Sequence, residues 1–162
     1  SFIVLTFILH SCSDKPSIDK SLIYSTLNEI IQQDTIFARI ICRKFDRARI
    51  PNDIQSEYLM NDKKFIQDQF KNSVNASVDT GKLFFYWRKK KGLDKSHIDT
   101  SCSLNIFYHL TYPIYSRDLQ TVIVGVTEDC VKCFLGGWGY TAVYKRQKGK
   151  WVRVKKYYEW IS

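Results

Sequence analysis

The second half of the chain alternates between apolar and polar residues over five separate stretches, and this pattern limits the possible folds more than any other feature. Strand side chains point alternately to opposite faces, so alternation rich in β-branched and aromatic residues predicts strands. The expected strands are 83–90, 104–112, 121–128, 140–146 and 151–161. Turn residues separate the last three, and Gly149 supplies the positive φ of a hairpin turn. The pattern therefore predicts an antiparallel C-terminal meander.

Two helices are expected before these strands. Apolar residues recur at helical spacing from Ile18 to Ile31, with Asp14 or Ser17 available as the N-cap. A second, shorter helix is expected over 62–72, capped by the asparagine just before it. Both helices are amphipathic, so each should bury one face against another layer.

The remaining N-terminal segments complete the predicted fold. Residues 36–43 alternate as a further strand, whereas 47–60 reads as a loop around Pro51. Helices followed by a strand meander indicate an α+β fold. We therefore expect an antiparallel sheet of about five to six strands, packed on one face by the two N-terminal helices.

The first eleven residues contain no Lys, Arg, Asp or Glu and lead directly to a cysteine. Residues 2–9, FIVLTFIL, have the length of a signal-peptide apolar region and are much shorter than the ~20 residues of a membrane-spanning helix. Leu9 stands three residues before Cys12 and Ser11 directly before it, which resembles the bacterial lipobox. His10 departs from the small or aliphatic residue that is usual at its position.

This resemblance implies a plan for the whole chain. Residues 1–11 are expected to be a signal peptide, incomplete at its start because no Met or basic segment precedes the apolar run. Residues 12–17 would be a lipidated tether attached through Cys12, and 18–162 a single α+β domain. The alternative is that the apolar run forms a buried strand ending in a core cysteine. The polar Ser-Asp-Lys-Pro after Cys12 favours the tether.

The protein is therefore expected in the bacterial cell envelope, as an outer-membrane lipoprotein on either the periplasmic or the surface side. Its net charge of +9 favours anionic partners. Because the protein is expected to be exported, we do not expect nucleic acid as a partner. The candidates are anionic lipid headgroups, lipopolysaccharide phosphates and glycans. Clusters of Lys and Arg also occur on ordinary solvated surfaces, so the charge alone does not choose among these.

Several motifs follow one another in the last third of the chain. They are PIYSRD at 113–118, VIVGV at 122–126, CVKC at 130–133, GGWG at 136–139, GKW at 149–151 and WIS at 160–162. Their order resembles a group of secreted or lipid-anchored proteins of Gram-negative bacteria that have no assigned activity. The residues between the cysteines, and the Phe-Leu pair that delays the glycines, depart from that pattern. The resemblance implies export and a C-terminal hairpin, with no mechanism attached.

Four cysteines remain once Cys12 is assigned to the lipid. An even number in an oxidising compartment makes Cys42, Cys102, Cys130 and Cys133 candidates for disulfides. The short separation of Cys130 and Cys133 favours a local bridge, which would leave Cys42 to pair with Cys102. That longer bridge would close a loop of about 60 residues and stabilise the fold by about 4 kcal/mol. The alternative, that Cys42 and Cys102 are separate buried thiols, stays open.

The same cysteines give little support to metal or redox chemistry. Glycines follow Cys133 where a thioredoxin-like site would need a helix, and a zinc site would need a second pair of ligands. No metal or cofactor is therefore expected. The alternative function is an envelope hydrolase with Cys102 as nucleophile and His97 or His109 as base.

The favoured function is a binding or structural module whose ligand the residues do not identify. The loop at 130–139 is expected to join two antiparallel strands and to display Phe134, Leu135 and Trp138 as a binding surface. The alternative for Trp138 is that it folds back onto the sheet. The aromatic and basic stretches at 84–88 and 140–145 suit either a glycan-binding surface or the core.

Overall fold

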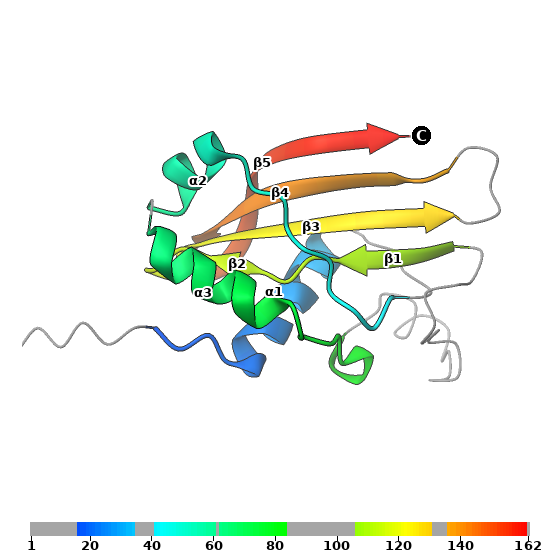
Figure 1. Cartoon of the computed structure of the whole chain (residues 1–162), viewed down its shortest axis with the longest axis horizontal. Coiled ribbons are helices and arrows are strands. Elements are labelled where there is room, and N and C mark those ends of the chain that lie inside the picture. Colours follow the sequence, from blue (N-terminus) through cyan, green and yellow to red (C-terminus); the bar gives the residue numbers. More distant parts are fainter. Residues whose placement is uncertain (1–15, 35–40, 61, 84–105, 131–135, 162) are drawn as a thin grey trace, which may run out of the picture.

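The computed structural model describes residues 16–34, 41–60, 62–83, 106–130 and 136–161. In this part of the chain three α-helices precede a five-stranded antiparallel sheet, which confirms the predicted α+β fold (Figure 1). The elements are α1 (Lys20–Gln33), α2 (Asn52–Tyr58), α3 (Lys63–Ser73), the short 3-10 helix η1 (Thr80–Lys82), β1 (Ile106–Leu110), β2 (Ile114–Tyr115), β3 (Thr121–Cys130), β4 (Trp138–Gln147) and β5 (Lys150–Ile161). None of the described helices is both long and apolar enough to cross a membrane.

The sheet has the strand order β1-β3-β4-β5, and the short β2 also pairs with β3. All four pairings are antiparallel, so the predicted C-terminal meander is confirmed. The β4–β5 hairpin turns through Lys148 and Gly149, whose φ angles are 50° and 80°. Two successive positive φ angles are typical of a two-residue hairpin turn, in which glycine carries no steric penalty.

The register of β3 and β4 divides their side chains between two faces. On the valine face, Val122, Val124 and Val126 lie opposite Tyr144, Ala142 and Tyr140 respectively. The alternate residues form the threonine face, on which Gly125 lies opposite Thr141 and Thr127 lies opposite Gly139. This division fixes which residues can act together, because neighbours in sequence project to opposite sides.

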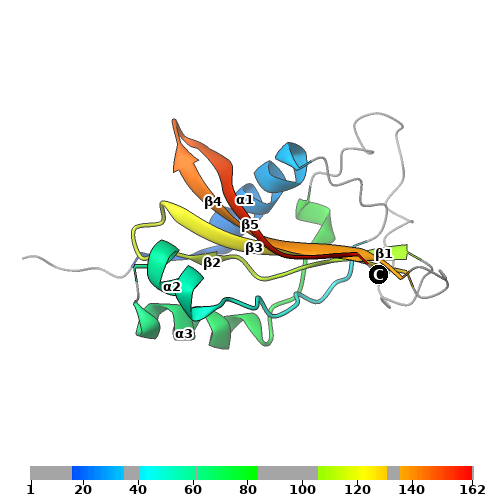
Figure 2. The same cartoon turned by 90° about the horizontal axis from the view of Figure 1, so that it is seen from above.

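Helices cover both faces of the sheet, so the expectation that they pack on one face is wrong. Figure 2 shows α1 on one side of the sheet and α2 with α3 on the other. The physical reason is that β3 and β4 bury large apolar side chains on both sides. Val124 on the valine face is fully buried, and so are Ile123 and Val143 on the threonine face. Each set needs its own apolar cover.

The valine face ends in a buried polar cluster at the C-terminus of α1. The Tyr140 hydroxyl donates a hydrogen bond of 2.6 Å to the Asp34 carboxylate, and the Tyr144 hydroxyl donates to the same oxygen. The Arg153 guanidinium lies 3.0 Å from the other carboxylate oxygen, and the Asp34 side chain is only 3% exposed. Burial raises the pKa of both tyrosines, so their hydroxyls stay protonated as donors.

The residues at which the helices begin differ from those that the local sequence pattern predicts. The N-caps are Asp19 and Asp62, which accept hydrogen bonds from the amides of Leu22 and Phe65 at 2.8 and 3.0 Å. The caps expected from the sequence, slightly further towards the N-terminus, are therefore wrong. The loop expected over 47–60 is also wrong in part, because α2 lies within it. Only Ile54 of its seven residues is buried, so no helical periodicity marks it.

Two predicted strands lie mostly outside the described residues. These are 83–90, of which only Leu83 is described, and 36–43, of which only the end is. That end forms a single parallel bridge from Ile41 to Tyr108, and Asp46 forms another to Thr111. The segment 41–46 therefore lies along the outer edge of β1 and starts one wall of the site described below.

Candidate functional site

A groove of about 1210 Å³ lies over the threonine face of the sheet. Small side chains form its floor, including Thr111, Gly125, Thr127 and Thr141. Gly125 is required there, because a Cβ atom at this position would lie 2.7 Å from the Thr111 methyl and 3.2 Å from the Thr141 hydroxyl. The Gly125 amide donates to the Thr111 hydroxyl at 2.7 Å, which fixes the floor.

The first wall of the groove is the chain between β1's outer edge and α2. The Asp46 amide donates to the Leu110 carbonyl at 2.9 Å, and the Asp46 carbonyl accepts from the Tyr112 amide at 3.2 Å. The wall then carries two exposed cations, Arg47 and Arg49. The Arg47 guanidinium carbon lies 5.5 Å from the centre of the Phe70 ring of α3, close enough for a cation–π contact.

The second wall is the last part of β5, where the strand is bulged. Thr141 pairs with Tyr157 and Gly139 with Trp160, so Tyr158 and Glu159 together lie opposite a single residue of β4. Tyr158 has a φ of 49°, a left-handed conformation that costs a non-glycine residue roughly 1–2 kcal/mol. Bulges of this kind redirect side chains, and here Tyr158 and Trp160 reach the groove.

The two aromatic rings of this wall stay open to solvent. Tyr158 is 56% exposed and Trp160 40% exposed. Gly139 makes room for the second ring, because a Cβ there would lie 2.7 Å from the Trp160 indole nitrogen. Exposed rings held in place by a strained backbone are a combination found at ligand sites, since packing alone does not require either feature.

A histidine links the first wall to the sheet. His109 of β1 is 17% exposed and lies between two carboxylates, with Nδ1 3.3 Å from Asp46 and Nε2 3.3 Å from Asp129. The hydrogen bond to Asp46 raises the His109 pKa most; burial lowers it, and the charges of both carboxylates raise it further. Within the described residues, no group of His, Cys, Asp and Glu has the makeup of a metal site.

Most of the residues singled out from the sequence lie outside the described part of the chain. These are Cys12, His97, Cys102, Cys133, Phe134 and Leu135, together with the side chain of Cys130, which ends β3. Cys42 is buried, and its amide donates to the Tyr108 carbonyl at 2.9 Å. The two disulfides and the lipid attachment therefore stay predictions.

Trp138 can be placed, and it lies apart from the groove. It opens β4 on the valine face, half-buried, and stacks on Tyr140 with ring centres 5.8 Å apart. It also meets Tyr108 edge-on at 6.2 Å. The preceding Gly137 has no room for a side chain, because a Cβ would lie 2.2 Å from the Glu128 carbonyl oxygen. The predicted antiparallel connection of the two strands is confirmed, and the role of Trp138 in binding stays a prediction.

The sequence did not identify the groove residues, although two signals were present. A glycine within a run of valines, as at Gly125, often marks close approach of another group. Gly139 repeats that signal on the neighbouring strand. The walls carried no such signal, because Arg47 and Tyr158 lie far apart in the sequence and meet only through the fold.

No family model, curated protein or solved structure matches this chain.

Proposed function

We propose that this protein is a binding module of the bacterial cell envelope, attached to the membrane through a lipid on Cys12, that holds a glycan in the threonine-face groove. The observation that carries the proposal is the bulged end of β5. It keeps two aromatic rings, Tyr158 and Trp160, exposed beside a floor of small and hydroxyl-bearing residues. Apolar ring faces combined with a few fixed polar groups suit a ligand that is amphipathic in the same way, as sugar rings are.

The charges of the groove favour a glycan over a polyanion. Arg47 and Arg49 are balanced by Asp46 and Glu159, which also line the groove. A strongly anionic ligand would meet both carboxylates, whereas a neutral or singly charged sugar can bond to cations, carboxylates and threonine hydroxyls together. This balance supports glycan binding in the groove and leaves the excess positive charge of the chain to other surfaces.

Glycan strands released from peptidoglycan are a suitable probe, because they carry at most one carboxylate on alternate sugars. Calorimetric titration of the mature chain with these strands should give saturable binding. Replacing one stacking ring should cost about 1.4 kcal/mol, so Trp160→Ala and Tyr158→Ala should each weaken binding about tenfold. Ile161→Ala is the matched control, because Ile161 is the adjacent residue, is 84% exposed and pairs with Trp138 on the other face.

The titration distinguishes binding in the groove from nonspecific binding elsewhere on the surface. If Ile161→Ala weakens binding as much as Trp160→Ala, or if the wild-type chain binds no glycan strand, the groove is not a glycan site. The hydrolase alternative with Cys102 gains no support from the described residues. Both ring nitrogens of His109 face carboxylates, which is a poor arrangement for a base that must take a thiol proton.

The envelope location rests on the lipobox-like sequence and has a test of its own. Mass spectrometry of membrane-extracted protein should find an N-terminus at Cys12 that carries acyl chains, and Cys12→Ser should leave an unprocessed precursor. Peptide mapping without reduction should recover the proposed Cys42–Cys102 and Cys130–Cys133 bridges. A soluble chain that still contains residues 2–9 would refute the anchor and leave the groove proposal untouched.

A further inference from the structure

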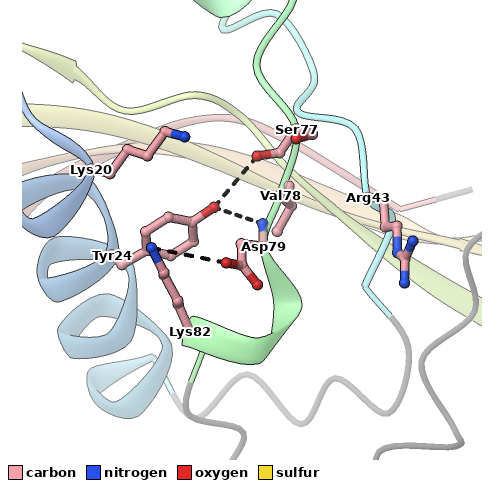
Figure 3. A pocket seen from close by; sticks show the side chains of 7 residues that line it. All are labelled: Lys20, Tyr24, Arg43, Ser77, Val78, Asp79 and Lys82. Carbon is pink, nitrogen blue, oxygen red and sulfur yellow. Dashed lines mark hydrogen bonds and ion pairs between the residues drawn. The ribbon is translucent and has the colours of Figure 1, made fainter.

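A second, smaller pocket of about 480 Å³ lies on the α1 side of the molecule (Figure 3). We call it the cationic pocket. Its lining residues are Lys20, Tyr24, Arg43, Ser77, Val78, Asp79 and Lys82. Three cations from three separate segments of the chain therefore line the pocket together with a single carboxylate. This excess of positive charge distinguishes the pocket from the charge-balanced groove.

The backbone that carries each cation is fixed. Lys20 is the first residue of α1, directly after the N-cap. The Arg43 carbonyl accepts a hydrogen bond of 2.6 Å from the Val78 amide. The Lys82 carbonyl accepts one of 2.9 Å from the Asn28 side chain of α1. Figure 3 shows the Lys20 and Lys82 ammonium groups on the Tyr24 side of the pocket and the Arg43 guanidinium across from them, beyond Val78 and Asp79. The fold fixes the backbone of all three positions, so the cations stay at the rim of one pocket.

Tyr24 forms a rigid wall of the cationic pocket. Its ring is 8% exposed, and its hydroxyl accepts from the Asp79 amide at 2.6 Å and donates to the Ser77 carbonyl at 3.4 Å (Figure 3). The Lys82 ammonium lies 5.5 Å from the centre of this ring. Because the hydroxyl is already engaged on both sides, the ring shapes the pocket and the cations are left to recognise the ligand.

The single carboxylate neutralises only part of this charge. One oxygen of Asp79 accepts from the Gly81 amide at 3.1 Å, and the other lies 3.9 Å from the Lys82 ammonium. Both of these side chains are about half exposed, so the pair is weak. Within the part of the chain that the structure describes, neither Lys20 nor Arg43 has a carboxylate partner.

We propose that the cationic pocket binds a phosphate group, carried by an anionic lipid headgroup or free in solution. The Lys20 and Lys82 ammonium groups supply point charges, and the exposed Arg43 side chain on the other side of the pocket carries a guanidinium that can hold two phosphate oxygens at once. The lipid source rests on the proposed anchor. Lys20 lies eight residues after Cys12, and an extended chain of that length spans at most about 28 Å, so headgroups are within reach.

The test uses the mature chain with Cys12→Ser, so that no acyl chain contributes to binding. One arm titrates inorganic phosphate by calorimetry, and the other measures co-sedimentation with vesicles of phosphatidylcholine with and without phosphatidylglycerol. Removing one cation that contacts a phosphate should weaken binding about fivefold, so Arg43→Gln and Lys20→Gln should each show this loss. Lys64→Gln is the control, since it removes the same charge from an exposed position on α3.

Each outcome has one meaning. Binding of both probes, or of either one, with loss in Arg43→Gln and Lys20→Gln but not in Lys64→Gln, supports the pocket and identifies the phosphate source. Absence of binding in both arms overturns the proposal, as does an equal loss in Lys64→Gln, which would indicate attraction by net charge alone. Trp160→Ala should bind phosphate normally, so failure of the glycan groove and failure of this pocket remain distinguishable.

Discussion

The valine face and the threonine face are built by the same two strands from alternate residues, yet the threonine face, which buries Ile123 and Val143 along one part, opens into a groove along the other. On the first, Val124 and Ala142 are fully buried and the tyrosine hydroxyls end on Asp34. On the second, glycines and threonines lie beneath an open groove. Because side chains along a strand point alternately to the two faces, one pair of strands can stabilise the fold on one face and bind a ligand on the other. Substitutions at adjacent positions should then have very different effects.

The largest effect is expected at the polar end of the valine face. Asp34→Ala removes the carboxylate that accepts from Tyr140 and Tyr144 and pairs with Arg153, leaving buried groups without a partner. Breaking such a cluster should lower the free energy of unfolding by about 3 kcal/mol, measured by urea denaturation.

An exposed ion pair beside the other face provides the control. Glu57 and Lys155 lie 3.5 Å apart with side chains 55% and 39% exposed. Glu57→Ala should therefore change the free energy of unfolding by less than about 0.5 kcal/mol. Equal losses for Asp34→Ala and Glu57→Ala would show that the buried cluster contributes no more than a surface pair.

Adjacent residues of β3 give the next test. Val126 is fully buried on the valine face, whereas Thr127 is half-buried on the floor of the groove. Val126→Ala should lower the free energy of unfolding by about 2 kcal/mol through lost burial and the cavity left behind, while Thr127→Ala should cost less than about 0.5 kcal/mol. Thermal denaturation of the two variants measures the difference. A larger loss of stability in Thr127→Ala than in Val126→Ala would contradict the assignment of stability to the valine face.

Part of this architecture could be predicted from the sequence, because strand alternation and turn residues are local signals. The expected strands at 121–128 and 140–146 lie within β3 and β4, and the turn at Gly149 is where the sequence places it. Alternation also separates the residues of the two faces correctly. It does not say which helix covers which face, because both sets of buried residues have the same period.

The groove could not be predicted, because it depends on contacts between distant segments. Its walls come from Arg47 before α2 and from Tyr158 at the end of β5. The position of Tyr158 depends on a register shift, which places two residues opposite Tyr140. Such a shift follows from how β5 packs along β4, and no residue pattern within β5 announces it. No pattern within α2 marks it either, because its only buried residue is Ile54.

A smaller effect is expected from relieving the strain at the bulge. At Tyr158, with φ of 49°, glycine has no steric penalty, so Tyr158→Gly should be more stable than Tyr158→Ala by about 1 kcal/mol. At the neighbouring Tyr157, which pairs regularly with Thr141, glycine should instead be less stable than alanine by about 0.5–1 kcal/mol. Urea denaturation of the four variants measures both differences. The same order at both positions would mean that the bulge is not strained.

The smallest effect distinguishes the two faces by pH. On the valine face, burial raises the pKa of Tyr140 and Tyr144, so these hydroxyls stay protonated near neutrality. On the threonine face, hydrogen bonding to Asp46 and the charges of Asp46 and Asp129 raise the His109 pKa above its usual 6.5, despite the opposing effect of burial. The folded state therefore binds the His109 proton more tightly than the unfolded state does.

The sign of the pH dependence follows from that difference. The stabilisation by protonated His109 is fully present below pH 6.5 and is lost as the pH rises through the higher pKa of the folded state. The free energy of unfolding should therefore decline over this interval in the wild-type chain and decline less in His109→Gln. Subtracting the two pH profiles removes the contribution of every other group. Parallel profiles would show that the carboxylates on either side of His109 do not favour its protonated form, and that the wall of the groove is held to the sheet by backbone hydrogen bonds alone.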